Sequence, residues 1–150
     1  MRGVDSATLT AALDKAQAEK PMDPAGIYVA PLGLDPIEVE GHEYSFYGAR
    51  VLPGKAVKGH WHGTGAEPYA GFTAPGLMYF GWLAECGEVV WADHPSEVKR
   101  EEEFTIWERV AHSFFNPGGT AIDFKFACPA AHLNDTDRFL AEIAPPYPVG

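Results

Sequence analysis

The sequence has little of what several protein classes require. Its 2 cysteines, Cys86 and Cys128, are too few for a disulfide framework in a chain of 150 residues, and free thiols are typical of the cytoplasm. No apolar run reaches the roughly 18 residues of a spanning helix, and residues 1–20 lack the apolar segment of a secretory signal. We therefore expect a cytoplasmic protein without a leader.

Basic residues are also scarce: 11 Lys and Arg stand against 21 Asp and Glu, which gives a formal net charge of -10. A surface with this balance repels the phosphate backbone of nucleic acids and anionic lipid headgroups. The charge predicts neither a nucleic acid nor a membrane as a partner. A small-molecule substrate is the expected partner.

Long helical segments are few, because 16 Gly and 13 Pro interrupt the chain. Short β-favouring runs lie between turn signals such as Pro53-Gly54 and Pro75-Gly76, and this spacing is typical of a sandwich or barrel. The charged stretch 93–103 is predicted as a solvated loop. The predicted strands are residues 26–30, 37–39, 44–52, 58–62, 69–73, 77–84, 89–91, 104–110 and 121–127.

The two ends differ from this pattern. Residues 6–20 are Ala-rich, can be capped by Asp5 or Ser6 and stop at Pro21, which predicts a helix. Residues 135–143 can form a second short helix before a proline-rich tail. We therefore divide the chain into a helical extension (1–22), a barrel (23–134) and a C-terminal helix with its tail (135–150).

One stretch carries ligands for a metal. On a strand, residues two apart point to the same face, so His60 and His62 present two imidazoles side by side. Glu67 follows after a turn and can return a carboxylate, and His112 arrives from a distant strand. Three imidazoles and one carboxylate suit a divalent transition ion, with Fe(II) preferred and Mn, Ni, Co or Zn possible.

These residues resemble the motifs of the cupin superfamily. The first motif is a glycine, five residues, His-x-His, three or four residues and Glu, which Gly54, His60, His62 and Glu67 meet. The second ends in His-x-x-x-Asn, which His112-Ser-Phe-Phe-Asn116 reproduces, although Trp107 and Arg109 replace the usual Pro-x-Gly before it. The resemblance implies an all-β fold, a single cupin (jelly-roll) β-barrel of about six to eight strands, here with a short helix at each end.

A closer resemblance, over roughly residues 24–135, is to the cupin-type phosphoglucose isomerases. These are metal-dependent dimers that interconvert aldose and ketose phosphates. The resemblance implies His60, His62, Glu67 and His112 as metal ligands, Tyr69 in the substrate site and a homodimer. Val57 stands where the family has a phosphate-binding threonine, which argues against a phosphorylated sugar. The matching segments are Leu52–Lys55, Lys58–His62, Glu67–Tyr69, Pro75–Met78, Ala111–His112 and Pro129–His132.

The positions of several other side chains in the sequence also indicate their roles. Lys58 shares strand parity with His60, so it either faces the cavity and binds substrate or reaches solvent. Trp61 is expected to point away from the interior and to pack elsewhere, such as at a subunit interface. Cys128 is interpreted as a small core residue. His42, His94 and His132 have no partner at ligand spacing and are interpreted as ordinary polar residues.

The leading functional hypothesis is a metal-dependent isomerase or lyase acting on a small oxygenated, sugar-like or hydroxy-carbonyl substrate. Glu67 and Tyr69 are the candidates to move the proton, and a nearby cation would favour the tyrosinate of Tyr69. The aromatic content favours a more apolar cavity than a sugar needs. Two alternatives stay open: an Fe(II)-dependent cupin dioxygenase for an enediol, aromatic or natural-product substrate, and a non-catalytic metal- or ligand-binding cupin.

Overall fold

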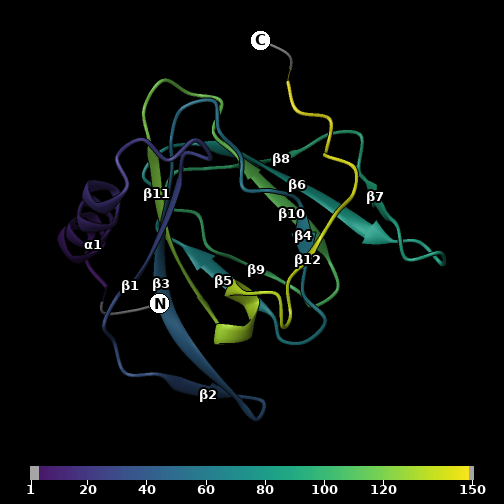
Figure 1. Ribbon diagram of the computed structural model, residues 1–150, viewed down its shortest axis with the longest axis horizontal. Coiled ribbons are helices and arrows are strands. Elements are labelled where there is room, and N and C mark those ends of the chain that lie inside the picture. Colours follow the sequence, from purple (N-terminus) through teal and green to yellow (C-terminus); the bar gives the residue numbers. More distant parts are fainter. Residues whose placement is uncertain (1–3, 149–150) are drawn as a thin grey trace.

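The computed structural model describes residues 4–148, and Figure 1 shows two curled sheets that face each other, with one helix outside them. The first sheet has the strand order β1-β3-β11-β5-β9, with β2 paired to β3. Its strands are β1 (Ile27–Pro31), β2 (Ile37–Val39), β3 (His42–Val51), β5 (Glu67–Ala70), β9 (Phe104–Ile106) and β11 (Ile122–Cys128).

The second sheet has the order β12-β4-β10-β6-β7, with β8 paired to β6. All pairings in both sheets are antiparallel, which confirms the predicted all-β class. The strands number twelve in residues 4–148, more than the nine segments predicted and more than the six to eight of the implied barrel. The second sheet comprises β4 (His60–Trp61), β6 (Gly76–Leu83), β7 (Val89–Trp91), β8 (Ser96–Val98), β10 (Ala111–Phe115) and β12 (Phe139–Leu140).

The main core lies between the two sheets and is rich in aromatic side chains. Phe72 is fully buried, and its ring stacks on Phe124 with centroids 4.8 Å apart. Aromatic pairs of this kind add about 0.5 to 1.5 kcal/mol beyond area burial. The core therefore gives the barrel a rigid frame on which the polar residues at its open end can be held. Its largest apolar members are Phe72, Met78, Phe114, Ile122, Phe124 and Phe126.

The predicted N-terminal helix is present as α1 (Ser6–Glu19), and Asp5 caps it by accepting from Thr8 N at 2.7 Å. Its buried residues Leu9 and Leu13 pack against the outer face of the first sheet. Helix and strand approach closely at Gly48 of β3, where a Cβ would lie 2.5 Å from Leu9 Cδ1. The helix covers the sheet and takes no part in the site described below.

Two predictions about local structure were wrong. Residues 135–143 form no helix; β12 in this segment pairs with β4, opposing Phe139 to Trp61 and Leu140 to His60. Strand pairing supplies partners for the backbone, which outweighs a weak helical preference. The charged stretch 93–103 was predicted as a loop but contains β8, which pairs with β6. Val98 of β8 is buried, and this apolar contact holds the segment against the sheet. A 3₁₀ helix, Ala130–Leu133, follows β11.

Within residues 4–148, no helix is long and apolar enough to cross a bilayer. This finding agrees with the composition, which contains no long apolar run.

Asn116, which ends the second motif, ties the turn after β10 to the sheet. Its buried amide donates to Val51 O at 2.9 Å and Thr120 O at 2.8 Å and accepts from Gly118 N at 3.0 Å. Asn116→Ala should therefore lower the free energy of unfolding, measured in urea, by about 1 to 3 kcal/mol, because buried partners lose their hydrogen bonds. The exposed Asn134→Ala is the control, with an expected change below about 0.5 kcal/mol. Equal stability of the two variants would contradict this role of Asn116.

Candidate metal centre

The candidate metal ligands meet because both sheets contribute to one end of the barrel. His60 on β4 lies directly opposite His112 on β10 in the antiparallel register. His62 follows β4 by one residue, and Glu67 begins β5 in the other sheet. All four side chains are buried. The structure thus brings together the four residues that the sequence proposed.

Each of the three imidazoles is oriented by a hydrogen bond to a backbone carbonyl. Nδ1 of His60 lies 2.6 Å from Lys58 O, Nδ1 of His62 2.7 Å from Asp137 O and Nδ1 of His112 3.0 Å from Val110 O. A carbonyl oxygen only accepts, so each Nδ1 carries the proton and donates it. Each Nε2 then carries a lone pair that points away from these carbonyls. Histidines that bind metals have this arrangement.

The free nitrogens converge on one point. Ligand atoms of His60, His62 and His112 all lie within 4.8 Å of one another. Nε2 of His62 and Nε2 of His112 are buried without a hydrogen-bond partner among the described residues. Buried polar atoms normally have partners, so these two orphaned acceptors fit a divalent cation. A histidine-rich site that could hold a metal is therefore present.

Protonation of these histidines is opposed by their surroundings. Burial, helped by the neighbouring His112, lowers the pKa of His60 to about 3. Burial likewise lowers the pKa of His62 to about 4, against the opposing effect of Glu67. Neutral imidazole is the form that binds metals. His60 and His62 are therefore in their ligating form at neutral pH.

Glu67 is the most heavily contacted group of the site. Its Oε1 accepts from the Tyr69 hydroxyl at 2.6 Å, and its Oε2 lies 2.7 Å from His132 Nδ1. The same carboxylate lies 3.3 Å from His62 Nε2 and 3.5 Å from His112 Nε2. Burial acts against the charged form of Glu67, but the neighbouring His112 and His132 outweigh it and hold its pKa well below the usual range. Glu67 is thus an ionised carboxylate beside the imidazoles.

Tyr69 shares a face of β5 with Glu67, as the sequence indicated, and is buried. Burial and the adjacent Glu67 carboxylate raise the pKa of Tyr69 well above its usual value. The protein groups around Tyr69 thus act against the tyrosinate that the sequence suggested. Tyr69 is a phenol that donates a hydrogen bond to Glu67.

His132 is a residue of the site that the sequence reasoning missed. Its ring stacks on His62 with centroids 3.9 Å apart, and its Nε2 lies 2.6 Å from Thr64 O. Both ring nitrogens thus face oxygen acceptors, an arrangement that suits the imidazolium. Burial lowers the pKa of His132, but hydrogen bonding to Glu67 outweighs it and raises the value overall. The available signal was its position just after β11, the strand that pairs with β5.

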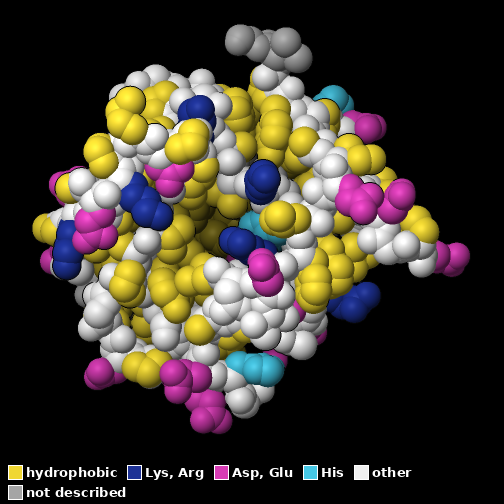
Figure 2. Space-filling model, in the orientation of Figure 1, with side chains coloured by type: hydrophobic (Ala, Val, Ile, Leu, Met, Phe, Trp, Pro, Cys, Tyr) yellow, Lys and Arg dark blue, Asp and Glu magenta, His cyan; other side chains and the backbone are white. Residues whose placement is uncertain are grey.

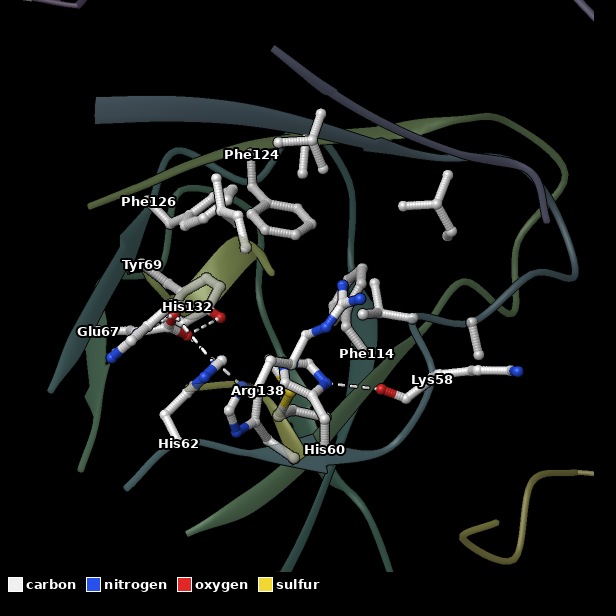
Figure 3. A pocket seen from close by; sticks show the side chains of 18 of the residues that line it. Lys58, His60, His62, Glu67, Tyr69, Phe114, Phe124, Phe126, His132 and Arg138 are labelled. Atoms are coloured by element: carbon white, nitrogen blue, oxygen red, sulfur yellow. Dashed lines mark hydrogen bonds and ion pairs between the residues drawn. The ribbon is translucent and has the colours of Figure 1, made fainter. Parts of the chain in front are cut away.

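Lys58 does not reach the centre. It precedes β4, so strand alternation does not fix its direction, and its side chain is exposed. Figure 3 shows its ammonium end directed away from the histidines. Lys58 lies at the edge of the pocket, where its backbone carbonyl orients His60.

A cavity of about 400 Å³ opens beside the cluster. In Figure 2 it is the hollow in the middle of the face shown, and its walls are mostly hydrophobic. Figure 3 shows Phe124 and Phe126 on one side of it and the histidines on the other. The apolar wall includes Ile27, Val29, Ala49, Phe114, Phe124 and Phe126.

The turn before His112 contains a residue in the left-handed conformation at the position of the motif glycine. Arg109 stands where the motif has glycine and adopts φ 65°, the left-handed conformation that glycine prefers. Its backbone N donates to His62 O at 2.7 Å. Trp61 points away from the cavity and stacks on Phe139 with centroids 4.4 Å apart, so it packs within the chain.

No protein-family model and no curated protein sequence matches this chain. Among solved structures, it is similar to a cupin-2 domain from Rhodospirillum rubrum, with 18% identity, a TM-score of 0.55 and coverage of 78% of this chain and 67% of that one. The chain has the cupin fold.

The chain is also similar to the solved structures of two other proteins. A polyketide cyclase from Streptomyces resistomycificus is 17% identical with a TM-score of 0.50, covering 79% of this chain and 73% of that one. A capsular polysaccharide assembling protein from Staphylococcus aureus is 17% identical with a TM-score of 0.53, covering 73% of this chain. The match spans only 34% of the latter protein. The resemblance to phosphoglucose isomerases stays a prediction.

Proposed function

We propose that the protein is a metal-dependent cupin enzyme, an isomerase or lyase that moves a proton on a small oxygenated substrate. The observation that carries the proposal is the set of converging Nε2 atoms whose Nδ1 partners are fixed by the backbone. His60, His62 and His112 would hold the metal, with Glu67 as the fourth ligand. A bound divalent ion would act as a Lewis acid that lowers the pKa of a C–H bond beside a carbonyl or hydroxyl oxygen.

The chain's own residues supply the proton handling. Glu67 lies at the cavity wall, so its carboxylate can accept a proton from a substrate carbon. The Tyr69 hydroxyl and the His132 ring fix the carboxylate in position by hydrogen bonds to its two oxygens. The apolar wall excludes water from the reacting atoms, which strengthens the electrostatic interactions inside.

One observation favours a second candidate, the Fe(II)-dependent dioxygenase. The cavity wall is apolar and aromatic on the side opposite the histidines, which suits an aromatic or natural-product substrate better than a sugar. Both candidates use the same ligands, and they differ in whether turnover consumes O₂. A cupin that binds its ligand without turnover is the third outcome.

The deciding experiment combines metal analysis with a substrate screen. The purified protein is assayed for Fe, Mn, Ni, Co and Zn, and candidate hydroxy-carbonyl and aromatic substrates are incubated in D₂O with and without O₂. We expect about one divalent ion per chain and deuterium incorporation that does not depend on O₂. Turnover only with O₂ would support the dioxygenase, and metal without any turnover would support a binding protein.

A homodimer belongs to the same proposal. Trp61 packs inside the chain, but Trp82 and Trp107 are 55% and 68% exposed and offer apolar surface for a second copy. Sedimentation should give about twice the chain mass of 16.3 kDa. A mass near that of one chain at micromolar concentration would contradict the dimer.

A further inference from the structure

Arg138 is a cationic residue of the pocket wall, with a side chain 39% exposed, and the metal site does not use its charge. Figure 3 shows its side chain reaching past the histidines into the middle of the pocket. The residue precedes β12, where alternate side chains point to opposite faces. Phe139 therefore turns outward onto Trp61, whereas Arg138 and Leu140 both line the cavity.

The position of Arg138 is fixed by its neighbour in the chain. The Asp137 carboxylate accepts from Gly63 N at 2.7 Å and from the Thr64 hydroxyl at 3.0 Å. The Asp137 carbonyl accepts from His62 Nδ1 at 2.7 Å. The segment that carries Arg138 is thus attached to the loop that carries a metal ligand. This attachment fixes the backbone from which the Arg138 side chain enters the cavity.

The Arg138 guanidinium has a hydrogen-bond donor without an acceptor among the described residues. Arg138 Nε is buried and has no hydrogen-bond partner among residues 4–148. Its one charged contact in that range is Asp135, 3.9 Å from Nη2 and fully exposed to solvent. Glu67, the carboxylate inside the cavity, is already bound by Tyr69 and His132. A buried donor without a partner costs free energy that an anionic acceptor would recover.

The rest of the cavity restricts which anion fits. Facing Arg138 is an apolar wall that includes Phe114, Phe124 and Phe126, which gives no hydrogen bonds to sugar hydroxyls. Lys58, the other cation at the pocket, is directed away from the cluster. One planar guanidinium matches one carboxylate in a two-point contact, whereas the apolar wall matches a ring or alkyl body.

We propose that the site takes an aromatic carboxylate, with the carboxylate on Arg138 and the ring against Phe114, Phe124 and Phe126. This inference rests on the proposed function only in assigning the same cavity to the substrate. Arg138 is accordingly a specificity-determining residue. A phosphorylated sugar is a poor fit, because its hydroxyls would face the aromatic wall.

Isothermal titration calorimetry with 3-phenylpropanoate as the probe tests the proposal. Its neutral amide, 3-phenylpropanamide, shares the ring without the charge, and glucose 6-phosphate supplies charge without the ring. Arg138→Gln should lower the affinity for 3-phenylpropanoate by about 10- to 100-fold, the usual effect of losing a charged hydrogen-bond pair. The same substitution should leave the amide unchanged. Arg100→Gln, at an exposed turn, is the matched control and should bind the probe like the parent.

The outcomes separate this inference from the proposed function, because metal content is measured on the same samples. Equal binding of the probe by Arg138→Gln and the parent would overturn the inference, as would tighter binding of glucose 6-phosphate than of 3-phenylpropanoate. Arg138-dependent binding to a protein that holds no metal would support the inference and refute the metal-dependent function. Metal in the protein without Arg138-dependent binding would refute the inference and leave the metal-dependent function supported.

Discussion

A variant with both His60 and His62 replaced by Ala should purify without the equivalent of divalent metal expected in the parent protein. Two of the three converging Nε2 atoms disappear, and the remaining imidazole and carboxylate offer too few ligands for tight binding. The measurement is metal content per chain by mass spectrometry after equilibration with a limiting metal buffer. Circular dichroism on the same samples checks that the barrel is intact.

Two substitutions make this result specific. His94→Ala removes an exposed imidazole and should leave the metal content unchanged. His132→Ala should also keep the metal, because both nitrogens of His132 already face oxygen acceptors. A full equivalent of metal in the double variant would refute the assigned ligands. Loss of metal in His132→Ala would instead point to the second cluster, formed by His62, Glu67 and His132.

Tyr69→Phe should leave the metal content unchanged yet lower turnover by about 10² to 10⁴, the usual scale for disturbing a general acid or base. The substitution removes the hydroxyl that donates to Glu67 Oε1 at 2.6 Å and leaves the ring to fill the core. Glu67 Oε1 then loses its hydrogen-bond donor, and only the His132 hydrogen bond to Oε2 still orients the carboxylate. The assay is initial rate on whichever substrate the deuterium screen identifies.

The controls for Tyr69→Phe use residues with known contacts. Tyr28→Phe removes another buried tyrosine's hydroxyl, bound to Lys20 O, and should not change turnover. Glu67→Gln should lower both metal content and turnover, because Glu67 serves as ligand and proton acceptor in the proposal. Near-normal activity of Tyr69→Phe with stoichiometric O₂ consumption would replace the proton-transfer scheme by the dioxygenase.

The elements that the sequence predicted well are those with local signals. Asp5, the Ala-rich run and Pro21 predicted α1 to within one residue of its end. The segments that it predicted wrongly, β8 and β12, are three and two residues long and exist because a neighbouring strand pairs with them. No local pattern specifies such strands, because the pairing energy comes from residues far away in the sequence.

The sequence by itself determined the fold class and proposed the four residues His60, His62, Glu67 and His112, because alternation along a strand and the spacing between motifs act over short distances. Only the tertiary structure decided which residues complete the site. His132 comes 65 residues after its partner Glu67, and Arg138 enters the cavity through a strand that pairs with β4. Such contacts depend on how the two sheets close, which the spacing of residues along the chain does not determine.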